Sequence, residues 1–174
     1  MENMTLIVSD RSLKTGLPDC GDTVLIDLTK QGIRNCMGCF GCWTKTPGRC
    51  VIRDDAVRIY PLIARSRRLL YVARVRDGGY DVPMKTLLER CIPVQQPFIR
   101  IVDGETHHVQ RTVVPKEAVI LAYGTRDAEE RALFRRLTDR NARNMNFAAW
   151  RVVFCDETAV ESQLRKELAA WENS

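Results

Sequence analysis

The sequence predicts an α/β fold built on an open, parallel sheet of five strands. Two observations carry this prediction: apolar runs of strand length recur along the chain, and segments with helical spacing separate them. Runs of about four to eight apolar residues are expected of parallel strands covered on both faces. The five predicted strands are Met4–Ser9, Thr23–Leu28, Arg68–Ala73, Ala118–Tyr123 and Ala149–Cys155.

Four helices are predicted between and after these strands. Pro83 falls in the first turn of one, and Thr158 with Glu161 three residues later has the spacing of a capping box at the last one. Alternating strands and helices favour a parallel sheet, and 174 residues suit a single domain over 1–174. The helices are predicted from Asp54-Asp55 onward and over Asp81–Cys91, Asp127–Met145 and Thr158–Trp171.

Two connections depart from this alternation. The first crossover, Asp10–Asp22, has 13 residues, close to the minimum for a parallel connection, and we expect it to hold at most one helical turn. The segment Ile92–Pro115 is long and has two apolar fragments around Asp103-Gly104. Asp-Gly between such fragments predicts a β-hairpin-like excursion from the sheet.

Charge and composition limit the partners. The formal net charge is +5, from 27 Lys and Arg against 22 Asp and Glu, and the arginines are scattered without an aromatic stacking pattern. This distribution favours solvated helix faces over a nucleic-acid surface. No apolar run approaches the ~20 residues of a membrane span. The N-terminus lacks a basic leader, so we expect a cytoplasmic protein without membrane contact.

Four of the seven cysteines lie in one short segment. Cys36, Cys39, Cys42 and Cys50 have the spacing C-x2-C-x2-C-x7-C. In a cytosolic chain such cysteines are not expected to form a disulfide framework. Three interpretations stay open: reduced thiols in a glycine-rich loop, an iron–sulfur cluster, or zinc.

These residues resemble a known family. The cysteine run with Trp43, then Pro47-Gly48-Arg49-Cys50 and Asp54-Asp55, is similar to the cysteine-bearing branch of the flavodoxin-like NADPH-dependent FMN reductases, related to iron–sulfur flavoproteins. Met84-Lys85, Glu89-Arg90 and Gly104-Glu105-Thr106-His107-His108 with Arg111 also resemble family segments. The resemblance implies a flavodoxin-like doubly wound sheet of order 2-1-3-4-5, bound FMN, NAD(P)H as substrate and a homodimer. It also implies a [4Fe-4S] cluster on the four cysteines.

The resemblance further implies an FMN site at the carboxyl edge of the sheet. Three loops would hold the cofactor, starting near Ser9, Ala73 and Tyr123. The family's first loop is Gly-Ser-rich and leads into a helix that binds the phosphate, whereas here the loop has Asp10 and lacks an evident helix. The candidate cofactor-binding residues are Ser9, Arg11, Ser12, Lys14, Thr15, Arg74, Gly78, Gly79, Tyr80, Tyr123, Gly124 and Thr125.

Two functions follow as hypotheses. The first is an FMN-dependent NAD(P)H oxidoreductase that passes electrons to a quinone, a flavin or an electron carrier, with an iron–sulfur cluster as a further relay. The alternative is a degenerate flavodoxin-like domain that has lost FMN and acts in binding or assembly. Trp43 and Tyr80 are candidate stacking residues. The adjacent His107 and His108 would point to opposite faces of a strand and so could not easily bind one metal together.

Overall fold

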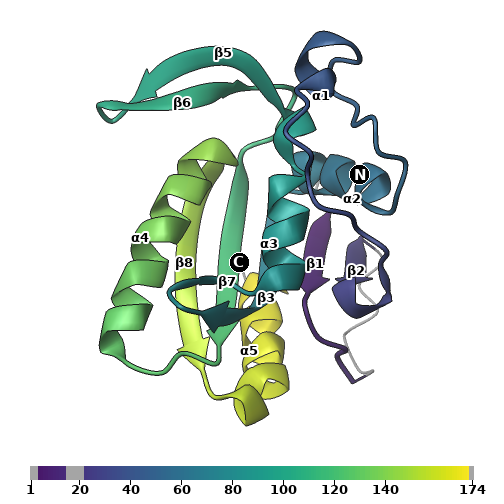
Figure 1. The fold of residues 1–174 in the computed structure, drawn as a ribbon. Helices are drawn as coiled ribbons and strands as arrows, with labels where there is room; N and C mark the ends of the chain where they lie inside the picture. The colour runs from purple at the N-terminus through teal and green to yellow at the C-terminus, as the bar shows by residue number, and fades with distance from the viewer. Residues whose placement is uncertain (1–3, 15–21, 173–174) are drawn as a thin grey trace.

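The computed structural model describes residues 4–14 and 22–172. Its centre is a parallel sheet in the order β2-β1-β3-β7-β8 (Figure 1), which confirms the predicted flavodoxin-like order 2-1-3-4-5. Each neighbouring pair in this order is parallel. The strands are β1 (Thr5–Ser9), β2 (Thr23–Asp27), β3 (Arg68–Arg76), β7 (Lys116–Tyr123) and β8 (Phe147–Cys155).

Helices cover the two faces of the sheet unequally. On one face, α2 (Ala56–Arg65), α3 (Val82–Glu89) and α4 (Ala128–Asn144) pack against the larger apolar core. On the other face, the smaller core is formed mainly against α5 (Val160–Glu172). The short helical turns are η1 (Leu28–Lys30), α1 (Gly41–Thr44), η2 (Ile92–Val94) and η3 (Glu157–Ala159).

The first crossover has no helix in the part that the structure describes, residues 10–14 and 22. This agrees with its short length. The chain here turns toward the start of α5: the Lys14 N–H donates to Glu161 Oε1 at 3.0 Å, and Arg11 donates to the Glu157 carbonyl at 3.2 Å. On β2, the Leu25 side chain stays 41% exposed.

The third strand is longer than predicted. It continues from Ala73 to Arg76, turns at Asp77-Gly78, and pairs antiparallel with β4 (Gly79–Tyr80). Asp77 and Gly78 both have positive φ, as a tight two-residue hairpin requires. A Cβ on Gly78 would lie 2.3 Å from a methyl carbon of Leu133, so α4 packs too closely for any other residue there.

The predicted excursion is a hairpin of β5 (Gln95–Val102) and β6 (Glu105–Gln110), joined at Asp103-Gly104. It forms a separate two-stranded sheet that projects over the C-terminal end of α4 (Figure 1). Glu105 holds it there through ion pairs to Arg140 and Arg143.

The predicted capping box at Thr158 is wrong. Thr158 lies inside η3, and α5 begins two residues later at Val160. The Glu161 carboxylate accepts from the Lys14 backbone instead of capping its own helix. The predicted apolar side of this helix is confirmed, because Leu164, Leu168 and Trp171 are all buried.

Candidate functional site

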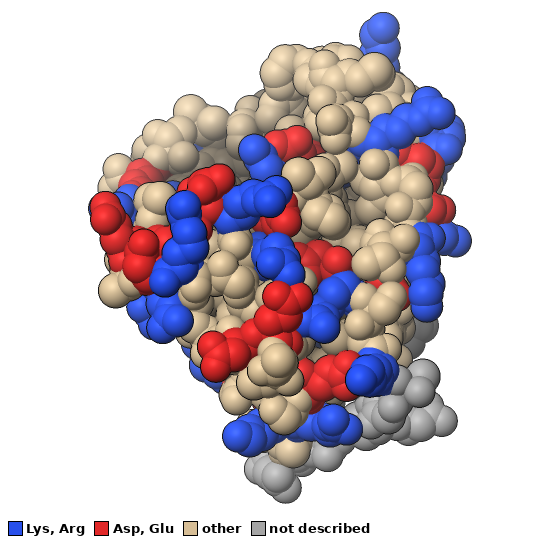
Figure 2. Space-filling model, turned by 60° about the horizontal axis from the view of Figure 1, so that its bottom comes forward, with Lys and Arg blue, Asp and Glu red and all other residues tan. Residues whose placement is uncertain are grey.

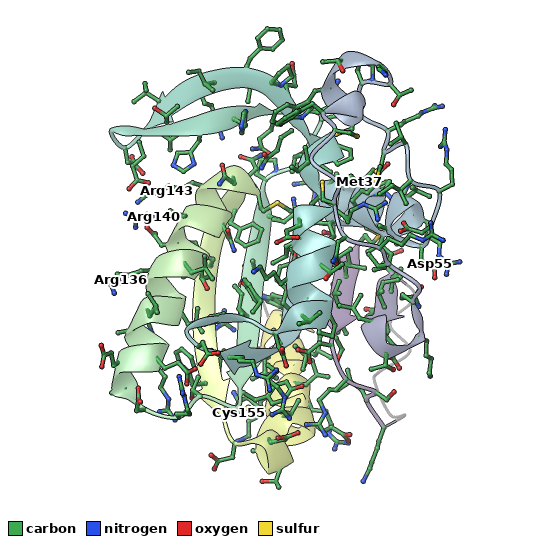
Figure 3. The ribbon with its side chains drawn as sticks, in the orientation of Figure 1. Met37, Asp55, Arg136, Arg140, Arg143 and Cys155 are labelled. Carbon is green, nitrogen blue, oxygen red and sulfur yellow. The ribbon has the colours of Figure 1, made fainter. Side chains whose placement is uncertain are left out.

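The two ends of the parallel sheet differ in what they carry. The carboxyl ends of the strands meet at the bottom of Figure 1, where the loops after β1, β3, β7 and β8 come together. Cys155 marks this edge in Figure 3, and Met37, in the cysteine segment, lies near the opposite end. Ligands of open α/β sheets bind at the carboxyl edge, so the predicted cofactor residues belong there.

Asp10 is fixed at the centre of this edge. Its carboxylate accepts a hydrogen bond from the Arg74 backbone N–H at 2.6 Å and another from the Tyr123 hydroxyl at 2.7 Å. Burial raises the pKa of Asp10, and these hydrogen bonds oppose the rise without cancelling it. The Asp10 carboxylate therefore accepts hydrogen bonds from both the Arg74 N–H and the Tyr123 hydroxyl, two donors that face this edge.

A second carboxylate, Glu157, joins two cations at the same edge. Its Oε1 atom lies 2.6 Å from Arg74 and 3.6 Å from Arg11. Both guanidinium groups also lie over the Tyr123 ring, at 5.0 and 5.4 Å from its centroid. Arg11, Arg74, Tyr123 and the two carboxylates thus form one network, here called the edge network.

The remaining predicted residues of the first loop are bonded to the chain itself. The Ser9 hydroxyl donates to the Arg11 carbonyl at 2.6 Å, and the Ser12 hydroxyl donates to Asp27 at 2.8 Å. The backbone N–H of Lys14 is bonded to Glu161. Thr15 lies outside the described residues. The Ser9 and Ser12 hydroxyls and the Lys14 backbone N–H are therefore already in use.

Of the predicted flavin contacts after β3 and β7, Arg74 and Gly124 lie side by side, whereas Tyr80 packs into the core. The Tyr80 ring packs edge-on against Phe134 with centroids 4.9 Å apart, and burial raises the pKa of Tyr80 to about 12. Thr125 accepts a hydrogen bond from Arg131, and Gly124 has positive φ beside Arg74. Tyr80 thus belongs largely to the core, and it is 7% exposed.

Two hollows lie beside each other near the loop after β3. The one lined by Arg74, Gly124 and Arg126 has a volume of about 190 Å³. The other, lined by Gly79, Tyr80 and Lys85, has a volume of about 640 Å³, which is within the range of about 300–1,000 Å³ that is common for ligand pockets. Figure 2 looks toward this end and shows acidic and basic side chains interleaved. Because Glu157 is paired with the guanidinium groups of Arg11 and Arg74, an FMN phosphate could use these two cations only by displacing that carboxylate.

The cysteine segment is organised by a buried arginine. The Arg90 guanidinium, with 0% side-chain exposure, donates to both Asp54 oxygens at 2.7 and 2.9 Å. It also donates to the carbonyls of Arg34 and Ile52 and to Cys50 Sγ at 3.4 Å. Arg90 directly follows the last residue of α3. Its hydrogen bonds to Arg34, Cys50, Ile52 and Asp54 thereby hold the segment from 34 to 54 against the end of this helix.

The acidic pair that was predicted to start a helix has a wider role. Helix α2 does begin directly after it, and Asp54 accepts from the Ala56 N–H. Asp54 and Asp55 also accept from the backbone N–H groups of Arg34 and Gly32. Burial raises the pKa of Asp54, but the hydrogen bonds from Arg90, Arg34 and Ala56 together with the Arg90 charge outweigh it, and the net pKa is lowered.

The prediction of a metal site at Cys36, Cys39, Cys42 and Cys50 is not supported. Over residues 4–14 and 22–172, no group of three or more His, Cys, Asp or Glu side chains has an arrangement that could hold a metal ion. Cys50 is engaged with Arg90, and Cys36 Sγ accepts from the Gly38 N–H at 3.5 Å. Neither an iron–sulfur cluster nor zinc follows from this geometry.

The two histidines point to opposite faces of the hairpin, as expected. His107 is buried and lies 3.0 Å from Asn144 Oδ1 and 3.3 Å from Glu105 Oε2. His108 packs against Trp43, with ring centroids 4.8 Å apart. The Trp43 indole donates to the carbonyls of Ile92 and Gln95, so Trp43 ties α1 to the hairpin.

Sequence reasoning missed two residues, Glu157 and Glu130, and one contact of a third, Arg90, that matter at these sites. Glu157 lies 83 residues from Arg74, and no local pattern links them. Arg90 lies in a segment that resembles the family, but no pattern in the sequence predicts its contact with Cys50. Glu130, buried in α4, accepts from the backbone of Gly78 and Arg126, and the Asp-Gly turn before β4 was the available signal for that contact.

No protein-family model and no curated protein matches this sequence. No helix among the described residues is long and apolar enough to span a membrane.

Solved structures do match, at low sequence identity. An FMN-dependent NADH-azoreductase from Bacillus anthracis, in complex with FMN, is 10% identical with a TM-score of 0.55 and covers 95% of each chain. NAD(P)H:quinone oxidoreductase from Methanothermobacter marburgensis is 11% identical with a TM-score of 0.58, over 95% of this chain and 92% of its own. General stress protein 14 from Treponema denticola, in complex with FMN, is 12% identical with a TM-score of 0.51 over 98% of each chain. At such identities the likeness establishes the fold: the chain is an α/β protein of the flavodoxin-like type.

Proposed function

We propose that this chain is a flavodoxin-like assembly protein, which does not hold FMN at the carboxyl edge of its sheet. The observation that carries the proposal is the edge network. Asp10 and Glu157 present carboxylates to Arg74 and Arg11, where an anionic cofactor would need free donors. A bound phosphate would have to displace one carboxylate and lie near the other, which like charges oppose.

The assembly surface in this proposal is one face of the β5–β6 hairpin. Ile99 pairs with His108 and Ile101 with Thr106, so these four side chains share a face. The Trp43 ring packs on His108, and the Phe40 and Trp43 rings stack with their centroids 5.4 Å apart. Ile99 is 64% exposed, Ile101 70% and Phe40 55%. These six residues are called the hairpin face.

A second copy of this chain is the occupant that the hairpin face suits best. The face has no Asp, Glu, Lys or Arg, so two copies can meet across a two-fold axis without bringing like charges together. Exposed aromatic and branched apolar side chains are typical of the centre of such an interface. The proposal is therefore a homodimer joined through its hairpins.

Flavin titration tests the first part of the proposal. Purified protein is added to FMN, and the quenching of flavin fluorescence is followed, with a solved FMN-binding flavodoxin-like reductase as the positive control. We expect no quenching at micromolar protein. Saturable quenching with one FMN per chain would refute the proposal.

Sedimentation tests the dimer. The variant Ile101→Asp places a charge on the hairpin face and should shift the protein from dimer to monomer. Val82→Asp is the matched control, because Val82 is 66% exposed but lies at the start of α3. A wild-type protein that is monomeric at all concentrations would contradict the hairpin dimer.

The second candidate function is an FMN-dependent NAD(P)H oxidoreductase acting on a quinone, flavin or electron carrier. It is favoured by the solved structures above, two of which were determined with FMN. In this case Glu157 would have to leave Arg11 and Arg74 before the cofactor binds. NAD(P)H oxidation that depends on added FMN and on a quinone would favour this candidate over the first.

A further inference from the structure

A hollow of about 780 Å³ lies beside the first part of the cysteine segment. Residues 32–35 and Met37 form one wall, and residues 51–54 form the other. Met37 lies at a different end of the molecule from Cys155, which marks the carboxyl edge (Figure 3). The volume is within the range of about 300–1,000 Å³ that is common for ligand pockets, and neither function proposed above uses this hollow.

Hydrogen bonds hold the two walls of the hollow against each other. Asp54, in one wall, accepts from the Arg34 N–H in the other wall at 2.9 Å. The buried Arg90 guanidinium donates to the Arg34 carbonyl at 2.7 Å and to the Ile52 carbonyl at 3.3 Å, so a single group joins both walls. The hollow is therefore preformed, and a ligand would bind with little ordering of the backbone.

Apolar side chains line much of this hollow. Ile33 and Met37 come from one wall, and Val51 and Ile52 come from the other. Met37 is 67% exposed and Val51 is 41% exposed. Water in the hollow thus contacts apolar surface, and an alkyl chain that displaced this water would be stabilised by the hydrophobic effect.

Two cations at the same hollow have no ionic partner in the described part of the chain. The Arg34 and Arg53 side chains are exposed, and over residues 4–14 and 22–172 neither takes part in a hydrogen bond or an ion pair. Asp54 is the acidic residue among those that line the hollow, and Arg90 already donates to both of its carboxylate oxygens. The hollow is therefore positively charged, which suits an anion.

The hollow of about 640 Å³ near the loop after β3 lacks this combination. Its lining includes three acidic residues, Asp77, Asp81 and Glu89, against the two basic residues Arg76 and Lys85. Arg76 is also paired with Asp81 at 3.6 Å. That hollow does not favour an anion, so the two arginines distinguish the hollow beside the cysteine segment.

We propose that the hollow beside the cysteine segment binds one molecule of a fatty acid. The carboxylate pairs with the guanidinium groups of Arg34 and Arg53, because an arginine fork matches the two oxygens of a carboxylate. The alkyl chain lies along Ile33, Met37 and Val51. The ligand class is thus an anion with a single apolar chain.

Displacement of a fluorescent fatty acid tests the site. The full-length protein is titrated with dansylaminoundecanoic acid, and dodecanoate is then added below its micelle concentration. We expect the dansyl fluorescence to rise on binding and to fall as dodecanoate displaces the probe. From decanoate to dodecanoate, the affinity should increase about fourfold for each CH₂ group, since each one buries further apolar surface.

A matched pair of variants tests the position of the alkyl chain. Met37→Asp puts a carboxylate beside the bound acid and removes an apolar contact, so dodecanoate affinity should fall by about tenfold or more. Phe98→Asp is the control, because Phe98 is also 67% exposed but lies in β5. Both changes are at exposed side chains, so both variants should fold.

A second pair tests recognition of the carboxylate. Arg53→Ala should weaken the binding of dodecanoate by up to about fivefold, as expected for an exposed ion pair. The same variant should bind dodecanol as wild type does, because the alcohol has no charge, whereas damage to the fold would weaken both ligands. Arg136→Ala is the control: Arg136 is an exposed arginine on α4 (Figure 3) and should affect neither ligand.

Four outcomes would overturn the proposal. They are no displacement of the probe by dodecanoate, equal losses in Met37→Asp and Phe98→Asp, unchanged dodecanoate binding in Arg53→Ala, and binding to phosphatidylglycerol vesicles without binding of monomeric dodecanoate. The last outcome would assign the surface to a membrane instead.

Ile101→Asp separates this proposal from the assembly proposal. This variant breaks the proposed hairpin dimer and should bind dodecanoate as wild type does, since Ile101 does not line the hollow. Loss of dodecanoate binding in Ile101→Asp would place the acid on the hairpin face and overturn the proposal. A monomeric wild-type protein that binds dodecanoate would contradict the dimer alone.

Discussion

The carboxyl edge of the sheet and the end that carries the cysteine segment have opposite characters. At the carboxyl edge, the charged groups of Asp10, Glu157, Arg11 and Arg74 are bonded to one another. At the other end, thiols are partly or fully exposed beside exposed apolar side chains, and the buried cation Arg90 lies among them. The charged side chains at the fold's customary ligand edge are thus paired, whereas the thiols lie at the opposite end. A shared fold therefore does not imply a shared site.

The largest effect is expected at Arg90. Arg90→Met removes one partner of a buried ion pair and leaves Asp54 without its cation, which typically costs about 3–5 kcal/mol. Urea unfolding measures the loss. Arg58→Ala is the control, because the Arg58 side chain is 67% exposed in its pair with Asp55 and should cost ~1 kcal/mol or less. Equal losses in both variants would mean that Arg90 does not organise the cysteine segment.

The next largest effect on stability is expected for a substitution of Lys116, the first residue of β7. It is 1% exposed, and burial lowers its pKa to about 8. Its charged form is therefore disfavoured in the folded state, a cost that is present below pH 8 and is relieved as the pH rises from 8 toward 10.5. Lys116→Met should stabilise the protein at pH 7 by at most ~3 kcal/mol, and the gain should shrink by pH 10. Thermal unfolding across this pH range measures both the gain in stability and its decrease with pH. A gain that does not change with pH would contradict the lowered pKa of Lys116.

Asp10 tests the edge network itself. Asp10→Ala leaves the Arg74 N–H and the Tyr123 hydroxyl without acceptors and should cost about 1–3 kcal/mol in urea unfolding. Asp10→Asn can bond to both groups and should not show this loss. Because burial raises the pKa of Asp10, its charge costs stability above that pKa, and wild type should gain on Asp10→Asn as the pH falls from 7 toward 4. A loss of wild-type stability relative to Asp10→Asn as the pH falls would contradict the raised pKa of Asp10.

The smallest effect concerns Glu157, which is 49% exposed. Glu157→Ala frees Arg11 and Arg74, and added inorganic phosphate should then raise the melting temperature more than it does in wild type. An exposed ion pair is worth ~1 kcal/mol or less, so the gain in phosphate affinity should be about fivefold at most. Asp156→Ala, one residue away, is the control. An identical response to phosphate in wild type and Glu157→Ala would show that Glu157 does not block an anion site.

The sequence predicted elements whose signals are local, and missed contacts between distant residues. The strands of the parallel sheet, the helix after Asp127 and the hairpin at Asp103-Gly104 each follow from a periodic or turn pattern, and all are present. The strand order followed from the resemblance to flavodoxin-like proteins and is also present. The Thr158 capping box failed because a tertiary contact to Lys14 claimed Glu161. The β4 hairpin was missed although Asp77-Gly78 signalled it. Glu157 and Arg90 were out of reach, because their partners are brought to them only by the complete fold.

The same contacts have a consequence for the order in which the molecule forms. Arg11 and Lys14 are bonded to Glu157 and Glu161, which lie 146 and 147 residues away in the chain. Contacts of such large sequence separation are slow to form, since a long loop must close before they contribute. During synthesis, the first strand and its loop leave the ribosome well before α5 exists. Glu157 and Glu161 reach Arg11 and Lys14 only when this C-terminal segment docks, so the bonds that fix the loop after β1 form late in folding.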